Sequence, residues 1–153
     1  MKLSSLIAVT LSLFVGVLVA APAPKEKDKD EKADLKKLQG EWTIESWEQV
    51  GQSLGVTGTW VFKDEKYTLD QSGNLEEGTI KLDSTKKPAV LDLDITAGNC
   101  QGKQQPGIFK FDGDSLILCF AWPGTTERPT EFSSTMDNRC ILITLKRAKK
   151  KDD

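Results

Sequence analysis

The sequence predicts an all-β domain, an up-and-down antiparallel barrel of about eight strands that follows a short helical turn. Three observations lead to this fold. Apolar and polar residues alternate with period two in short runs between residues 42 and 145. Turn residues such as Gly, Asp and Asn separate most runs, and only residues 34–38 show helical spacing. About eight such strands can close into a barrel, which removes exposed, aggregation-prone edges.

The helical turn and the first strand meet at Gly40. Two leucines three residues apart suit one helical turn over residues 34–38, and Gly40 ends that turn. From Trp42 the pattern changes to an alternation that places Trp42 and Ile44 on one face. We therefore expect the first strand to begin at Trp42.

The same alternation predicts the remaining strands. A turn at residues 112–114 joins two of them as a hairpin, and a long loop at 122–138 precedes the last one. Each run presents large apolar side chains to one side, as half-buried antiparallel strands do. The barrel domain is expected over residues 38–147. The runs are residues 59–63, 66–71, 75–83, 89–96, 109–111, 116–120 and 141–145.

Residues 1–20 have the composition of a secretory signal peptide. Met1 and Lys2 precede an apolar run that ends in small residues at 20–23, which is the order of charged start, apolar centre and cleavage region in such signals. Cleavage near residues 20–23 would export the domain to the periplasm or the extracellular space. The run is nearly long enough to cross a bilayer, so the alternative is an uncleaved N-terminal membrane anchor.

Charged segments flank the predicted barrel. Residues 21–37 alternate Lys with Asp and Glu and contain little apolar surface, which predicts a flexible, solvated linker. Because the charges nearly cancel, a linker is favoured over an electrostatic docking segment. Residues 148–153 form a similar charged tail.

Composition argues against several classes of function. A net charge of −2 at pH 7 and a pI near 5.3 provide no general attraction to nucleic acid or to an anionic membrane. The sequence contains no His, the usual proton-transfer residue near neutral pH and the commonest metal ligand. No nucleophile–base pair or set of metal ligands stands out, so we expect no enzyme activity, no metal and no cofactor.

Gly40, Glu41 and Trp42 resemble the start of a lipocalin barrel. Lipocalins and other calycins open their first strand with glycine-x-tryptophan after a short helical turn, and a basic side chain from the last strand packs over the tryptophan. Arg147 shares the parity of the apolar residues in the last strand. The resemblance therefore implies that Arg147 packs on Trp42 and closes the barrel beside Gly40.

Further segments carry a more specific resemblance: Leu38 to Trp42, Glu77 to Asp83, Lys86 to Pro88, Pro106 to Ile108, Asp112 to Asp114, Leu118 to Ala121, Glu127 to Phe132 and Leu145 to Arg147. Together they resemble an uncharacterised lipocalin-like domain family known mainly from planctomycete bacteria. The resemblance extends over residues 34–147. It implies a fold, but this family has no established activity, ligand or catalytic residue to transfer.

The cysteines allow a disulfide if the chain is exported. Cys119 ends one predicted strand and Cys140 begins the next, both on the face opposite the apolar row. Antiparallel pairing would bring them together, so we expect a Cys119–Cys140 bridge, worth ~3 kcal/mol on the chain-entropy model. Three free thiols are the alternative. Cys100, in a glycine-containing loop, is then the odd thiol.

The loop at residues 122–132 is the candidate binding surface, because long polar loops on rigid scaffolds often carry function. Its Trp122 has the sequence context of an exposed aromatic residue. Arg128 and Glu131 either belong to a binding site or pin the loop to the barrel rim while Phe132 anchors it.

Two functions fit these expectations. The first is a non-enzymatic, exported protein that binds a small apolar molecule inside the barrel or at its open end. The second is an interaction module with a solid barrel, whose 122–132 loop contacts a protein or another polymer of the cell envelope. An apolar cavity of a few hundred Å³ would favour the first, and a filled core with an exposed aromatic patch the second.

Overall fold

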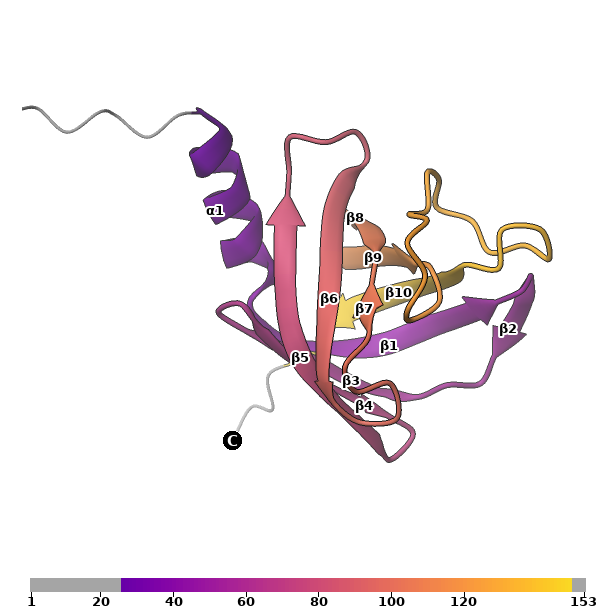
Figure 1. The fold of residues 1–153 in the computed structure, drawn as a ribbon. Helices are drawn as coiled ribbons and strands as arrows, with labels where there is room; N and C mark the ends of the chain where they lie inside the picture. Colours follow the sequence, from indigo (N-terminus) through magenta and orange to yellow (C-terminus); the bar gives the residue numbers. More distant parts are fainter. Residues whose placement is uncertain (1–25, 150–153) are drawn as a thin grey trace, which may run out of the picture.

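The fold is a closed antiparallel barrel with one helix at its N-terminal side (Figure 1). The computed structural model describes residues 26–149, so the predicted signal peptide and residues 150–153 of the charged tail lie outside it. Within the described chain the strand order is β10-β9-β8-β6-β5-β4-β3-β1, and β1 also pairs with β10. This pairing closes an eight-stranded barrel and confirms the predicted fold class.

The eight predicted strands are all present in the structure, with bounds that differ from the expected ones by a few residues. The helix and these strands are α1 (Glu26–Leu38), β1 (Gly40–Gln49), β3 (Gly58–Lys63), β4 (Lys66–Gln71), β5 (Asn74–Asp83), β6 (Ala89–Ala97), β8 (Gly107–Asp112), β9 (Ser115–Phe120) and β10 (Ile141–Arg147).

Two further short strands lie beside these eight. β2 (Gln52–Leu54) pairs with the end of β1 and is exposed along its whole length, so it has no apolar alternation to reveal it. β7 (Gln104–Gln105) pairs with β6, and Pro106 separates it from β8. Because proline has no backbone N–H to donate, the ladder is interrupted there.

The predicted helical turn at residues 34–38 is the end of helix α1, but the prediction of a flexible linker is wrong because the helix begins at Glu26. The segment is rich in good helix formers, and Lys36 and Lys37 in its last turn complement the helix dipole. Leu38 is fully buried in the core and Leu35 packs against it. An anchored last turn supplies the nucleus from which a charged helix can propagate. No helix within residues 26–149 has the length and apolar character needed to cross a membrane.

A β-bulge in β1 changes which side chains face the barrel interior. The pairing of β1 with β10 shifts between Ile44 and Ser46, so Glu45 is the extra residue. Trp42 and Ile44 are buried before the bulge, and Trp47 is buried after it. An uninterrupted alternation from Trp42 would have placed Trp47 on the outer face. The bulge therefore adds a third large side chain from β1 to the interior.

The end of the barrel next to α1 is sealed by the contact that the lipocalin resemblance implied. The guanidinium of Arg147 lies 4.0 Å from the Trp42 ring centroid and donates hydrogen bonds to the carbonyl oxygens of Lys37 and Gln39. Trp42 Nε1 donates to the Leu38 carbonyl at 2.8 Å. These bonds satisfy carbonyl groups that the end of a helix leaves without partners.

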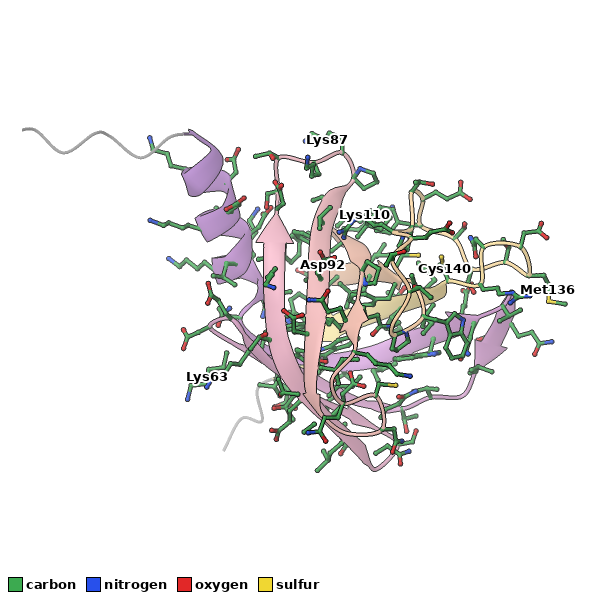
Figure 2. All side chains as sticks on the ribbon, in the orientation of Figure 1. Lys63, Lys87, Asp92, Lys110, Met136 and Cys140 are labelled. Carbon is green, nitrogen blue, oxygen red and sulfur yellow. The ribbon has the colours of Figure 1, made fainter. Side chains whose placement is uncertain are left out.

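Glycine at position 40 allows both the backbone conformation at this junction and the close approach of the Arg147 guanidinium. The φ of +104° at Gly40 is strained for any residue with a side chain, and a Cβ there would lie 3.2 Å from Arg147 Nη1. The predicted group of Gly40, Trp42 and Arg147 is thus a structural junction between helix and barrel. Figure 2 shows Lys63 on the side of this junction and Cys140 among the loops away from α1.

Candidate functional site

A cavity of about 220 Å³ lies at the end of the barrel opposite α1. Its walls come from the second half of β1, the end of β4, the start of β5, the end of β9 and the start of β10. In an antiparallel barrel these strand ends meet on one side, away from the start of β1 and the end of β10. The lining residues are Trp47, Gln49, Trp60, Leu69, Gln71, Glu76, Cys100, Gln105, Phe120, Trp122, Pro123, Ile141 and Ile143.

Aromatic rings form much of this wall, and Trp60 is their centre. Its ring stacks on Phe120 and on Phe62, with centroid distances of 5.9 Å and 5.6 Å, and is tilted against Tyr67 at 5.9 Å. Aromatic pairs at such separations stabilise one another beyond the area that they bury. The wall around Trp60 is therefore a rigid, preformed surface.

The buried indoles of the cavity present ring carbon to it, not N–H groups. Within the described chain, Trp47 Nε1 and Trp60 Nε1 have no hydrogen-bond partner, and each exposes less than 1 Å² of surface. Trp42, at the sealed end, has its N–H satisfied by Leu38. Trp47 and Trp60 line the cavity but are only 6% and 1% exposed, so the ring surface that a ligand could reach comes from Trp47 and mainly from Trp122.

One carboxyl group lies in the wall beside the aromatic rings. Glu76 is partly buried, and its Oε1 accepts a hydrogen bond of 2.9 Å from the Tyr67 hydroxyl. Gly78, two residues further on β5, is paired with Tyr67, and a Cβ there would lie 2.6 Å from Tyr67 Cε1. The glycine therefore lets the tyrosine ring lie flat against the strand and reach Glu76. Burial raises the pKa of Glu76, because desolvation disfavours its charged form.

The neutral polar residues of the wall have mixed roles. Gln105 is buried, and its Nε2 donates to the Ala121 carbonyl at 2.8 Å, which ties β7 to the end of β9. Cys100 is partly buried and packs against the core cluster. The odd thiol of the sequence analysis therefore lines the barrel cavity.

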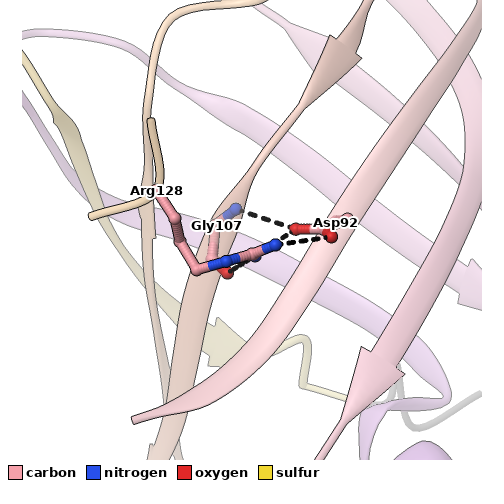
Figure 3. Close-up of polar contacts among 3 residues, drawn as sticks. All are labelled: Asp92, Gly107 and Arg128. Carbon is pink, nitrogen blue, oxygen red and sulfur yellow. Dashed lines mark hydrogen bonds and ion pairs between the residues drawn. The ribbon is translucent and has the colours of Figure 1, made fainter. Parts of the chain in front are cut away.

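Arg128 pins the 122–132 loop to the barrel. Its guanidinium forms a two-pronged ion pair with Asp92 on β6, in which the Nη2–Oδ2 distance is 2.9 Å (Figure 3). Arg128 Nη1 also donates to the Gly107 carbonyl at 2.8 Å, and the Gly107 N–H donates to Asp92 at 3.2 Å. Each of the three residues is hydrogen-bonded to the other two. The structure therefore favours a structural role for Arg128 over a role in a binding site.

Of the other three predicted loop residues, Trp122 and Glu131 line the same surface groove as Arg128, whereas Phe132 does not. Glu131 accepts a hydrogen bond of 2.8 Å from Ser133 in its own loop, so the expected pin to the rim is wrong for this residue. Phe132 is partly buried in a small cluster outside the barrel, where Lys110 Nζ lies 4.6 Å from its ring centroid. Trp122 is 42% exposed.

Trp122 lies between the barrel cavity and an open surface groove. The groove has a volume of about 880 Å³ and is lined by the loop residues 121–131 and by residues 137–140. Trp122 lines the groove as well as the barrel cavity. It is therefore the predicted loop residue that contributes to both hollows.

The predicted Cys119–Cys140 disulfide is absent, and both residues are free thiols. Their expected proximity is correct, because Phe120 pairs with Ile141 and the two side chains interact with each other. They are buried with Ile108 on the outer face of the barrel. Burial raises the pKa of the Cys119 thiol to about 12.

The residues that sequence reasoning missed are Trp47 and Glu76. Trp47 was hidden by the bulge, which no simple alternation predicts. Glu76 follows the same alternation as the inward-facing Gly78 and Ile80 along β5. This alternation could have shown that its side chain points toward the barrel interior. A charged residue in an inward position is the feature to notice in such a strand.

Within residues 29–149, no cluster of three or more Cys, Asp or Glu side chains is arranged to hold a metal ion. A scan against protein-family models finds no match to this chain, and searches of curated proteins and of solved structures find none either. Function must therefore be inferred from the geometry of the barrel cavity.

Proposed function

We propose that the protein is an exported, non-enzymatic, lipocalin-like binding protein that holds a small, largely apolar molecule in its barrel cavity. The aromatic-walled cavity of about 220 Å³ carries this proposal. This hollow opens to solvent beside Trp122, has the volume of about seven waters at ~30 Å³ each, and lies beside a rigid aromatic cluster.

The size of the cavity restricts the ligand. Pockets for drug-sized molecules usually span ~300–1,000 Å³, so a cavity of about 220 Å³ suits a compact molecule better than a long acyl chain. Trp122, which is 42% exposed, lies where the cavity borders solvent and would contact a molecule that enters.

A compact neutral probe, 3,3-dimethyl-1-butanol, tests this function by nuclear magnetic resonance. We expect it to shift the indole N–H resonances of Trp47 and Trp60. Gln71→Trp places a large ring in the cavity wall and should abolish the shifts. Leu75→Trp is the matched control, because Leu75 is 63% exposed and does not line the cavity. Resonances that stay in place in the unmodified protein would refute cavity binding.

A second candidate function is protein or polymer binding at the groove beside the 122–132 loop. The exposed Trp122 and the groove of about 880 Å³ favour it, because exposed aromatic residues often anchor interfaces. Trp122→Ala should then abolish capture of a cell-envelope component by the immobilised protein. Capture that survives this substitution would exclude Trp122 as the anchor.

Export rests on the composition of residues 1–23. Intact-mass measurement of the protein from the periplasm or the culture medium should show a chain that begins near residue 21–24. A mature chain that retains Met1 would instead support the membrane anchor.

A further inference from the structure

The charge of the barrel cavity is set by one residue. Among the described residues that line it, Glu76 alone carries a formal charge, and no Lys or Arg is among them. No ion pair of Glu76 is present within residues 26–149, and its hydrogen-bond partner is the neutral hydroxyl of Tyr67. A carboxylate that is partly buried without a cation is costly, because the desolvation has no compensating attraction. Burial accordingly raises the pKa of Glu76.

Aromatic rings surround the same space. Trp47, Trp60, Phe120 and Trp122 all line the cavity. Trp60 and Phe120 are each 1% exposed and stack on each other. The ring surface open to a ligand therefore comes from Trp47, at 6%, and mainly from Trp122, at 42%. Aromatic faces carry partial negative charge and attract cations, most strongly in desolvated sites lined by tryptophan.

An anion does not suit this cavity. It would be repelled by Glu76, and the wall offers no basic side chain to hold it. The polar groups of the wall include a carboxyl and side-chain amides. Electrostatic attraction to them favours a positively charged ligand over a neutral or a negatively charged one. A methylated or alkylated ammonium ion combines that charge with an apolar surface that fits aromatic walls.

We infer that the cavity binds a small organic ammonium ion, whose charge lies against Glu76 and whose alkyl groups contact Trp47 and Trp122. This inference rests on the proposed function, because it names the ligand class of the same cavity. Glu76 is then the residue that determines specificity, and the aromatic rings provide most of the contact surface.

Choline and 3,3-dimethyl-1-butanol test the inference as a matched pair. The two molecules have the same shape, but only choline carries a positive charge. Titration followed by the Trp47 and Trp60 indole resonances should show choline binding roughly 5- to 30-fold more tightly, the range expected for a desolvated cation–π contact.

Glu76→Gln should reduce this preference without abolishing it, because the aromatic rings still contact the cation. Because the Gln amide oxygen can still accept the Tyr67 hydrogen bond, the variant should fold, and circular dichroism checks this. We expect choline to bind at least about fivefold more weakly and 3,3-dimethyl-1-butanol to bind as before. Glu77→Gln is the matched control, because Glu77 is the next residue on β5 and is exposed. It should change neither affinity.

Two outcomes would overturn the inference. The ammonium specificity is wrong, while cavity binding stands, if the unmodified protein binds 3,3-dimethyl-1-butanol at least as tightly as choline. The same holds if Glu76→Gln leaves the ratio of the two affinities unchanged. If neither probe moves a cavity resonance, the inference and the proposed function both fail.

Discussion

Arg147→Ala removes three contacts at the sealed end of the barrel. The guanidinium lies 4.0 Å from the Trp42 ring centroid, a cation–π contact worth about 0.5–1 kcal/mol at a partly exposed site. It also donates to the carbonyls of Lys37 and Gln39, and each such hydrogen bond contributes about 0.5–1.5 kcal/mol net. The terms add to roughly 1.5–4 kcal/mol. Because Arg147 is exposed and water can replace some bonds, we expect a loss near 2 kcal/mol.

Urea unfolding followed by circular dichroism measures this loss. Arg147→Lys keeps a positive charge near the ring but lacks the planar fork, so it should lose about half as much stability. Lys146→Ala is the control, because Lys146 points outward to Glu45 in an ion pair that is exposed on both sides. It should have no measurable effect. If Arg147→Ala lowers the free energy of unfolding by less than about 0.5 kcal/mol, the sealing role is refuted.

A double-mutant cycle with Trp42→Leu isolates the ring contact, because leucine has no aromatic face. Arg147 and Trp42 are in contact, so their substitutions should be non-additive by about 0.5–1 kcal/mol. Strict additivity would mean that Arg147 stabilises the junction through the helix carbonyls alone.

Three further predictions concern other parts of the molecule. Arg128→Ala, which removes the pair with Asp92 and the bond to Gly107, should lower the free energy of unfolding by about 1–2 kcal/mol. Differential scanning calorimetry should show the drop, and an unchanged melting temperature together with lost partner capture would make Arg128 a binding residue instead. The folded pKa of Glu76 is raised above its ordinary value of 4.5, so its favourable contribution is present below pH 4.5 and is lost as pH rises through the folded pKa. Glu76→Gln should therefore flatten the dependence of unfolding free energy on pH above 4.5, and identical curves for the two proteins would contradict this. Burial raises the pKa of Cys119 to about 12, so at pH 8 its thiol should resist iodoacetamide while partly buried Cys100 reacts. Peptide mapping measures both, and rapid alkylation of Cys119 would show that its cluster opens readily.

The barrel was predictable because its signal is local and repeated. Strands β4 and β5 were expected at residues 66–71 and 75–83, and the structure places them at Lys66–Gln71 and Asn74–Asp83. Each has one inward apolar row and one polar row, and a short turn joins them. The junction of Gly40, Trp42 and Arg147 was predictable for a different reason, because it depends on a motif and on parity in the last strand.

The shape of the barrel cavity was not predictable, because it depends on departures from that regularity. The bulge at Glu45 sends Trp47 inward, and its position is fixed by pairing with β10 rather than by local sequence. Pro106 separates β7 from β8 and allows Gln105 to reach the Ala121 carbonyl. Only the last turn of α1, at residues 34–38, was predicted; residues 26–33 were missed because the helix is stabilised by the anchoring of Leu38 in the barrel, which composition cannot show.

The two ends of the barrel differ in how fully their buried tryptophan N–H groups are hydrogen-bonded. At the α1 end, Trp42 is 2% exposed, its N–H is satisfied by Leu38, and Arg147 covers its ring. At the other end, Trp47 and Trp60 keep unsatisfied N–H groups, which is a free-energy cost that a purely structural core would avoid. Both unsatisfied N–H groups belong to residues that line the barrel cavity, so the cavity end of the core is less completely hydrogen-bonded than the α1 end.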